Sequence, residues 1–379
     1  MKFSTKLIHG SKNPEQKSKP LAPAITLSTT FYYNESDYKY SRSNNPNRNL
    51  LEEKLAILEN AKFCSAFSSG VAAISSILMY LKPGDSLIVN KAIYGGTFRI
   101  IKDILEPFNI KAIWCNLSNL EEAKKLILPS TKMVYFETPS NPLLKIFDIK
   151  AIAKFASDFD LISVCDNTFL SPYFQNPLEL GVSVVVHSTS KFLGGHSDIT
   201  GGAVMTNDEK LYTHIKMFQK TNGAVPSPFD TWLTERSLKT LAVRMNKQDE
   251  NARAVATFLK ESNYCKMVYY PGLYDDEESR IHKSQATGGG AVVSVDFGSQ
   301  ERALGVVLNF ELFAFAESLG GVESIVSHPF TMSHSFLSPE EKEENGITPG
   351  LLRFSCGLED SNDLISDIKK AVEEFDNRK

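Results

Sequence analysis

A single lysine stands in a hydroxyl-rich turn behind an apolar run. Residues 184–196 read Val-Val-Val-His-Ser-Thr-Ser-Lys-Phe-Leu-Gly-Gly-His, with the lysine at position 191. A buried strand that ends in such a turn brings Lys191 to the carboxyl edge of a sheet, where α/β folds bind ligands. A desolvated lysine loses its proton readily and then condenses with a carbonyl group. Ser188 and Ser190 are candidates to hydrogen-bond a phosphate. The alternative is a surface turn with an ordinary lysine.

An acid ends a second apolar run, because Asp166 follows residues 161–165 directly. An aspartate at such a position often only caps the next turn. Opposite a pyridinium nitrogen, however, an acid keeps that nitrogen protonated, as the cofactor pyridoxal 5'-phosphate (PLP) requires. An acid, then hydroxyl groups, then a lysine on successive strands fits a PLP site.

Two further turns match such a cofactor. Residues 67–73, Phe-Ser-Ser-Gly-Val-Ala-Ala, open an apolar helix and offer backbone N–H groups to a phosphate. Many helices begin with serine and glycine as plain caps, so this motif is weak alone. Tyr94 precedes Gly95 and Gly96, and it either stacks on a flat cofactor or packs in the core.

The elements that must position these residues alternate along residues 49–205. Short apolar runs rich in β-branched residues predict strands at 86–90, 112–115, 133–138, 161–166 and 182–187. Helical patterns are found at 51–58, 71–80, 95–106, 120–127 and 149–158. Strands buried on both faces and separated by helices predict an α/β fold with a mainly parallel sheet. A long helical region at 228–259 then leads to a smaller α/β part, with strands at 267–270, 291–297 and 352–355 and a helix near 362–375.

Composition limits the classes of partner. A chain of 379 residues favours two domains. A net charge of -4 gives no electrostatic case for nucleic acid or an acidic membrane, and no apolar run suits a secretory signal or a membrane span. Five scattered cysteines fit reduced thiols in a cytoplasmic protein better than a disulfide framework, and we expect no metal site.

Two other classes of protein share the alternating pattern. NAD-dependent oxidoreductases are disfavoured, since no Gly-x-Gly-x-x-Gly follows the first strand. A non-catalytic binding module on the same fold stays open. A visible absorption band from bound PLP would separate the enzyme from both alternatives.

Taken together, the motifs resemble the Cys/Met-metabolism PLP-dependent enzyme family, which comprises the cystathionine γ-lyase, γ-synthase and β-lyase group and methionine γ-lyase. The resemblance extends almost from end to end, and the joint order of the motifs is far more specific than any one of them. The motifs lie at residues 40–46, 69–70, 94–97, 137–142, 166–168, 187–191, 317–324 and 352–360.

The resemblance implies the PLP-dependent transferase fold of type I, with a large mostly parallel-sheet domain and a smaller C-terminal α/β domain. It implies an N-terminal arm at 1–48 that contacts a neighbouring subunit, a PLP-binding domain at 49–245 and a C-terminal domain at 246–379. The assembly would be a homotetramer, a dimer of dimers. Its partner would be a small sulfur amino acid, without nucleic acid or membrane.

The resemblance also assigns roles to single residues. Lys191 would carry PLP and move protons, Asp166 would pair with the pyridine nitrogen, and Tyr94 would stack on the ring and help to move protons. The other cofactor-binding residues would be Ser69, Gly70, Val71, Thr168, Ser188 and Ser190, joined by Tyr40 and Arg42 from the neighbouring subunit. The substrate-binding residues would be Asn141, Glu317, Ser318 and Arg353, with Arg353 gripping the carboxylate.

The sequence departs from the family pattern at two positions: Ser190 replaces a more usual threonine, and Lys39 replaces an acidic residue that synthases and γ-lyases often carry before Tyr40. Lys39 bears on substrate preference rather than on the cofactor. Glu317 resembles the γ-synthase and γ-lyase groups, whereas Gly96 differs from the cysteine typical of methionine γ-lyases. We therefore expect cystathionine γ-lyase activity, with γ-synthase as the first alternative and β-lyase as the second.

Overall fold

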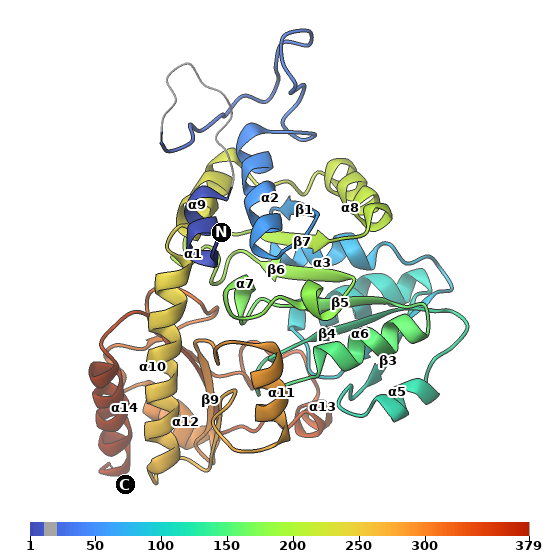
Figure 1. Cartoon of the computed structure of the whole chain (residues 1–379). Coiled ribbons are helices and arrows are strands. Elements are labelled where there is room, and N and C mark those ends of the chain that lie inside the picture. The colour runs from blue at the N-terminus through green and yellow to red at the C-terminus, as the bar shows by residue number, and fades with distance from the viewer. Residues whose placement is uncertain (11–20, 379) are drawn as a thin grey trace.

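The computed structural model describes residues 1–10 and 21–378, and this part of the chain folds into two β-sheets with helices packed against them (Figure 1). Residues 11–20 of the predicted arm lie outside the described residues. Within the described ranges, no helix has both the length and the apolar composition that crossing a membrane requires.

The larger sheet has seven strands in the described part of the chain, in the order β1-β7-β6-β5-β4-β2-β3. Only β7 runs antiparallel to its neighbours, so the predicted mainly parallel sheet is confirmed. Its strands are β1 (Phe63–Phe67), β2 (Ser86–Asn90), β3 (Lys111–Cys115), β4 (Thr131–Glu137), β5 (Ile162–Asp166), β6 (Val184–Ser188) and β7 (Gly202–Thr206). We did not predict β1 and β7, because small residues interrupt their apolar pattern.

Helices cover both faces of this sheet. The first face packs on α1 (Phe3–His9), α2 (Pro46–Leu58) and α6 (Ile149–Asp158), and the second on α3 (Gly70–Leu78) and α8 (Glu209–Asn222). Side chains alternate along a strand, so Cys165 and Val185 face the α2 side, whereas Val164 and Val184 face the α3 side. By the same alternation, Asp166 and Ser188 leave their strands on the α3 side.

The smaller sheet has five strands within the described ranges, in the order β10-β11-β12-β9-β8. They are β8 (Met267–Tyr269), β9 (Val292–Asp296), β10 (Ala314–Phe315), β11 (Ile325–Ser327) and β12 (Leu351–Ser355). The apolar core of this part gathers residues of α10 (Leu241–Glu261), α12 (Gln300–Val307) and α14 (Ser361–Asp376) around the sheet. In Figure 1, α10 runs from the upper part of the molecule down to α14, so it links the two parts.

In the structure, the helical region predicted at 228–259 consists of two helices, α9 (Pro228–Leu238) and α10. Arg244 Nη2 donates to the carbonyl oxygen of Ser237 at 3.0 Å, which also accepts from the N–H and the hydroxyl of Thr240 between the two helices. The remaining elements are α4 (Gly95–Arg99), η1 (Ile100–Leu105), η2 (Glu106–Phe108), α5 (Leu120–Lys125), α7 (Ser171–Phe174), η3 (Pro177–Leu180), α11 (Glu277–Gln285) and α13 (Pro339–Glu344).

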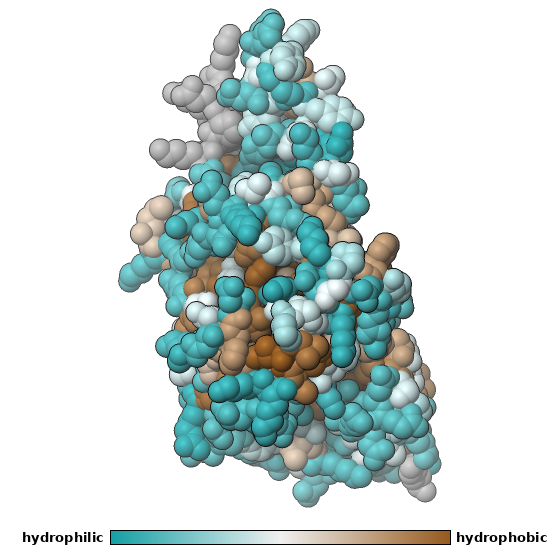
Figure 2. Space-filling model, turned by 90° about the vertical axis from the view of Figure 1, so that its right-hand side faces the viewer, coloured by the Kyte–Doolittle hydropathy of each residue, from teal (hydrophilic) through white to brown (hydrophobic). Residues whose placement is uncertain are grey.

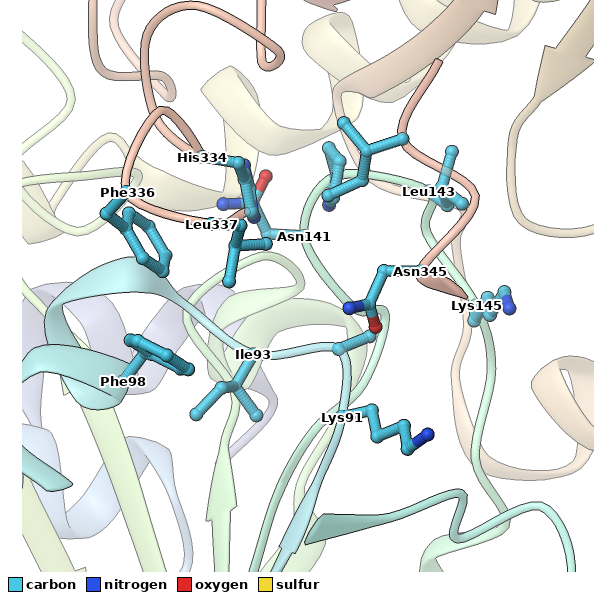
Figure 3. A pocket seen from close by; sticks show the side chains of 13 residues that line it. Lys91, Ile93, Phe98, Asn141, Leu143, Lys145, His334, Phe336, Leu337 and Asn345 are labelled. Atoms are coloured by element: carbon cyan, nitrogen blue, oxygen red, sulfur yellow. The ribbon is translucent and has the colours of Figure 1, made fainter. Parts of the chain in front are cut away.

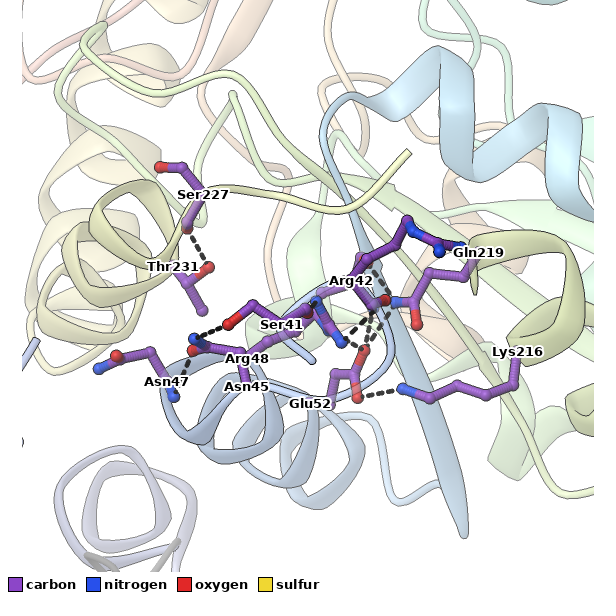
Figure 4. A network of polar contacts seen from close by, with 11 residues as sticks. Ser41, Arg42, Asn45, Asn47, Arg48, Glu52, Lys216, Gln219, Ser227 and Thr231 are labelled. Carbon is purple, nitrogen blue, oxygen red and sulfur yellow. Dashed lines mark hydrogen bonds and ion pairs between the residues drawn. The ribbon is translucent and has the colours of Figure 1, made fainter. Parts of the chain in front are cut away.

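The segment of residues 21–45 extends away from the larger sheet at the top of Figure 1. Side chains at the start of α2 hold it (Figure 4): Arg48 Nη1 donates to the Ser41 carbonyl oxygen at 2.8 Å, and Asn47 Nδ2 donates to the Ala24 carbonyl oxygen at 2.8 Å. Glu52, one turn further on, accepts from Lys216 of α8 at 2.7 Å. The arm is therefore tied to the body by a polar network around α2.

Large apolar side chains stay exposed on this arm. Tyr32 is 80%, Tyr33 74% and Leu27 71% exposed in the single chain. Figure 2, turned by 90°, shows that hydrophilic residues cover most of one face and that apolar residues gather near its middle.

Candidate active site

Lys191 lies just beyond the carboxyl end of β6. Its amine donates a hydrogen bond of 2.6 Å to Ser318 Oγ, which comes from the C-terminal part of the chain. Burial, followed by the positive charge of Arg353, lowers the pKa of Lys191 to about 8, although Glu317 acts in the opposite direction. A larger fraction of this amine is neutral near pH 8 than for an exposed lysine, so it can act as a nucleophile.

Arg353 forms a buried clamp beside this lysine. From the middle of β12, its Nη1 donates to Asn141 Oδ1 at 2.7 Å and its Nη2 to the Ser318 carbonyl oxygen at 2.9 Å. Burial lowers the pKa of Arg353 to about 10, which leaves the guanidinium charged at neutral pH. Its Nε has no hydrogen-bond partner among the described residues, so one donor remains for a carboxylate.

Ser318 joins these two cations. Its backbone has a φ of 90°, a value uncommon for residues other than glycine, and this conformation accompanies its contacts with both Lys191 and Arg353. Glu317, the preceding residue, is exposed, and its charge raises the pKa of both cations. A substrate cation would therefore meet a carboxylate at the rim of the clamp.

Asp166 is buried at the end of β5, next to β6. Its Oδ1 accepts hydrogen bonds from Thr168 N at 3.0 Å and Thr168 Oγ1 at 2.6 Å, and Thr168 Oγ1 accepts from Ser188 N at 2.9 Å. Burial raises the pKa of Asp166, and the hydrogen bonds from Thr168 oppose that effect. Its Oδ2 is 3.5 Å from the Tyr135 hydroxyl, a weak contact that leaves an acceptor for a cationic partner.

The turn before α3 lies against the end of β6. A Cβ added to Gly70 would lie 2.9 Å from Ser188 Cβ, and one added to Gly202 would lie 2.3 Å from the Ser69 carbonyl oxygen. Only glycine allows this approach, which brings the first backbone N–H groups of α3, at Gly70 and Val71, next to Ser188. Ser190 Oγ accepts from Gly201 N at 2.9 Å, and so belongs to the same corner.

Tyr94 stands at the start of α4, and its backbone N–H donates to Glu137 Oε2 at 3.0 Å. The ring is 38% exposed and lies over Gly96, where an added Cβ would be 2.2 Å from Tyr94 Cε1. Burial raises the pKa of Tyr94, which keeps the phenol protonated at neutral pH.

Glu137 is a residue to which the sequence analysis gave no role, although it lies within one of the quoted motifs. It ends β4, pairs in register with Asp166 of β5, and also accepts from Asn141 N at 2.6 Å. Burial, followed by the charge of Asp166, raises the pKa of Glu137 far above its usual value. The signal was available: like Asp166, this acid closes an apolar strand.

The arm residues make other contacts. Arg42 Nη1 donates to the Lys220 carbonyl oxygen at 2.8 Å and its guanidinium lies 5.5 Å from the Tyr40 ring, which is itself part of an exposed side chain. Lys39 Nζ lies 4.3 Å from the centre of the Tyr33 ring. No contact in the described chain joins Tyr40 or Arg42 directly to Lys191.

These groups fit PLP by their own geometry. The Gly70 turn forms a cradle with no room for a side chain, a buried carboxylate keeps an open acceptor, and a lysine of lowered pKa lies at the same sheet edge. A phosphate, a protonated ring nitrogen and an aldehyde are the three partners that such groups would hold.

Comparisons with known proteins agree with this site. A family model described as "Cys/Met metabolism PLP-dependent enzyme" matches residues 4–373. A cystathionine gamma-lyase of Dictyostelium discoideum is 43% identical over 98% of both chains, and the cystathionine beta-lyase MetC of Bacillus subtilis is 42% identical over 98% of this chain and 97% of the relative. The structure of a cystathionine gamma synthase from Xanthomonas oryzae, in complex with aminoacrylate and cysteine, has a TM-score of 0.96 at 36% identity, covering 100% of this chain and 99% of that one.

Proposed function

The chain belongs to the Cys/Met metabolism PLP-dependent enzymes, and from this premise we propose that it is a cystathionine γ-lyase that releases cysteine, 2-oxobutanoate and ammonia. Membership establishes an enzyme with PLP as its cofactor and the fold of this family. Relatives with γ-lyase, β-lyase and γ-synthase activity are about equally similar, so the choice of reaction depends on the residues of this chain.

Within this proposal, Lys191 would carry PLP, Asp166 would pair with its ring nitrogen and Tyr94 would stack on the ring. The start of α3 and the end of β6 would hold the phosphate through Gly70, Val71, Ser188 and Ser190, with Tyr40 and Arg42 from a second chain. Ser69 and Thr168 would be further cofactor-binding residues. PLP, when bound, supplies an electron sink that stabilises negative charge on the carbon next to the substrate's amino group.

The substrate's carboxylate is held by Arg353. Its unpartnered Nε supports this role, and Asn141 and Ser318 keep the guanidinium plane in place. A planar donor fixed on two sides holds a carboxylate in one orientation, which directs the α-proton toward a single base.

Two groups move protons. The neutral amine of Lys191 takes the proton from the substrate's α-carbon, because its lowered pKa leaves a lone pair available. After passing that proton on, the same amine removes a proton from the β-carbon, and the electron pair left there forms a double bond to the γ-carbon as the bond from the γ-carbon to sulfur breaks. Tyr94, whose raised pKa keeps its hydroxyl protonated, delivers a proton to the departing sulfur, and water then releases 2-oxobutanoate and ammonia. Both groups follow the carboxyl ends of strands of the larger sheet, Lys191 after β6 and Tyr94 after β2.

Glu317 is the observation that favours cystathionine γ-lyase. Its exposed carboxylate stands next to the Ser318–Arg353 clamp and attracts the distal ammonium group of cystathionine. Because γ-synthases often carry the same glutamate, Glu317 favours γ-lyase over β-lyase and leaves γ-synthase as the first alternative. Several β-lyases have an apolar residue here. A side chain at Gly96 would collide with Tyr94, which disfavours the methionine γ-lyase pattern.

The proposal also includes assembly and location. We place domain limits after residues 48 and 245 and expect a cytoplasmic homotetramer. The exposed Tyr32, Tyr33 and Leu27 of the arm support packing against another chain, since such apolar surface gains from burial.

A product assay tests the reaction. Purified holoenzyme incubated with cystathionine should release cysteine and 2-oxobutanoate, and Lys191→Ala should abolish turnover of any sulfur substrate. Pyruvate and homocysteine as the only products would reject γ-cleavage. A faster reaction of O-succinylhomoserine with cysteine, forming cystathionine, would favour γ-synthase instead.

A further inference from the structure

A short segment of the C-terminal part, residues 333–337, packs on the first turn of α4. The ring of Phe336 fills the space beside Gly95: a Cβ added there would lie 2.3 Å from Phe336 Cε1. The same ring is 4.9 Å from the ring of Phe98, centre to centre, and Arg99 Cζ is 5.6 Å from its centre. Phe336 therefore touches the beginning, the middle and the end of this helix.

The other side of the turn carries Tyr94. Its ring lies over Gly96, where an added Cβ would be 2.2 Å from Cε1. The Gly95-Gly96 turn is thus enclosed by two aromatic rings, one of which belongs to a proposed catalytic residue. Because protein interiors are closely packed, a shift of the Phe336 ring moves the Gly95-Gly96 turn, and the turn in turn moves the Tyr94 ring. The location of Phe336 therefore restricts where Tyr94 can lie.

The segment is itself anchored beside the carboxylate clamp. His334 is buried, and its ring is 6.0 Å from that of Phe336 with an angle of 28° between the planes. Figure 3 shows His334 next to Asn141, whose Oδ1 accepts from Arg353, with Phe336 and Phe98 further along the wall of the same small cavity. His334, next to the carboxylate clamp, and Phe336, next to the Gly95 turn, are only two residues apart.

We propose that Phe336 is a positioning residue that holds Tyr94 in its working location through the Gly95 turn. The inference rests on the proposed function insofar as Tyr94 handles a proton, but it applies to whichever sulfur substrate the enzyme converts. The contact between the Phe336 ring and Gly95 can be disrupted by a substitution at either residue, and substitutions at both residues together should restore part of the packing.

A double-mutant cycle tests this contact. Phe336→Ala removes the ring, and Gly95→Ala pushes a methyl group into it. Each should lower kcat by about 10- to 100-fold, with a smaller change in KM, because a displacement of Tyr94 by about 1 Å is enough for such a loss. In the double variant the methyl group occupies space that the ring has left, with the Ser333 carbonyl oxygen 3.0 Å away. We expect its kcat to exceed that of Gly95→Ala by about threefold or more.

The chain offers a matched control outside the site. A Cβ added to Gly305 of α12 would lie 2.1 Å from Phe375 Cε2, and Phe375, like Phe336, is partly buried. Gly305→Ala and Phe375→Ala should lower the thermal midpoint as much as the Phe336 and Gly95 variants do, and leave kcat and KM at the wild-type values.

Four readouts separate the possible outcomes: kcat, KM, the visible absorption of bound PLP and the thermal midpoint. The proposal expects a lower kcat with the absorption retained. It is overturned if Phe336→Ala changes only the midpoint, or if the two substitutions reduce kcat independently. Phe336→Leu gives the same comparison should the alanine variant fold poorly. A wild-type enzyme that does not cleave cystathionine would refute the proposed reaction but not the role of Phe336. The variants test that role separately, because their kcat is compared with that of the wild type on whichever sulfur substrate it converts.

Discussion

Individual residues of this site acquire their chemistry from burial next to charge. Lys191 and Arg353 are two cations joined through Ser318, and the charge of Arg353 lowers the pKa of Lys191. Glu137 and Asp166 are two buried carboxyls at neighbouring strand ends, and the charge of Asp166 raises the pKa of Glu137. A cofactor with a cationic ring nitrogen and an anionic phosphate would relieve part of both repulsions.

The lowered pKa of Lys191 predicts how the PLP-free protein takes up its cofactor. Below pH 8 the amine is mostly protonated and lacks a lone pair, whereas above pH 8 it is neutral. The rate of reconstitution, followed by visible absorption, should therefore rise with pH up to about 8 and then level off. A rate that keeps rising toward pH 10.5, the ordinary pKa of lysine, would contradict the lowered pKa of Lys191.

The same shift has a consequence for stability. The folded pKa lies below that of the unfolded chain, so the unfolded state binds more protons between pH 8 and 10.5. The contribution of this lysine to stability is thus unfavourable below pH 8 and becomes less so as the pH rises through that window. Lys191→Met, which cannot titrate, should remove this part of the pH dependence of unfolding in the PLP-free protein.

Elements place these residues through close backbone approaches. The carboxyl ends of β4, β5 and β6 meet at one edge, and α3 begins against the last of them. Glycine makes the approach possible, since Gly70 lies against Ser188 and Gly202 against Ser69. The helix start is thereby brought close enough for its N–H groups to bind an anion.

Gly70→Ala should weaken cofactor binding more than it weakens the fold. The added methyl group would lie 2.9 Å from Ser188 Cβ and would push α3 away from the phosphate corner. We expect the dissociation constant for PLP, measured by equilibrium dialysis, to rise by about tenfold or more, as for a lost charge-assisted hydrogen bond. Gly288→Ala is the control: its methyl group would lie 2.4 Å from Phe174 Cε1, outside the phosphate corner, and should affect only stability. Equal PLP affinity in both variants would refute the proposal that the Gly70 turn holds the phosphate of PLP.

At the scale of the whole molecule, we propose that the arm of one chain completes the active site of a second chain. Arg48 and Asn47 tie it to α2, and Glu52 ties α2 to α8 (Figure 4). The network holds the arm in shape while Tyr32 and Tyr33 remain exposed. An ordered segment with an apolar exposed surface is suited to docking on a second copy of the chain.

Mixed oligomers test whether the arm acts between chains. Lys191→Ala lacks the amine, and Arg42→Ala lacks the proposed phosphate contact. After the two variants are mixed and allowed to exchange subunits, half of the pairs contain one chain of each kind. If Arg42 acts on its neighbour, one site of each mixed pair is intact and about one quarter of the wild-type activity should return. No recovery, despite subunit exchange shown by mass, would mean that Arg42 acts within its own chain.

The sequence by itself determined the alternating α/β fold, the lysine, the acid and the order of the motifs, because these depend on local periodicity and on residue type. It also carried the information for Glu137, an acid at a strand end, which we did not interpret. Only the tertiary structure revealed that Ser318 joins Lys191 to Arg353, and that Phe336 lies against Gly95. The physical reason is that such contacts join residues that are far apart in the sequence, by 35 positions for Ser318 and Arg353 and by 127 for Lys191 and Ser318, and packing at a distance leaves no periodic signal along the chain.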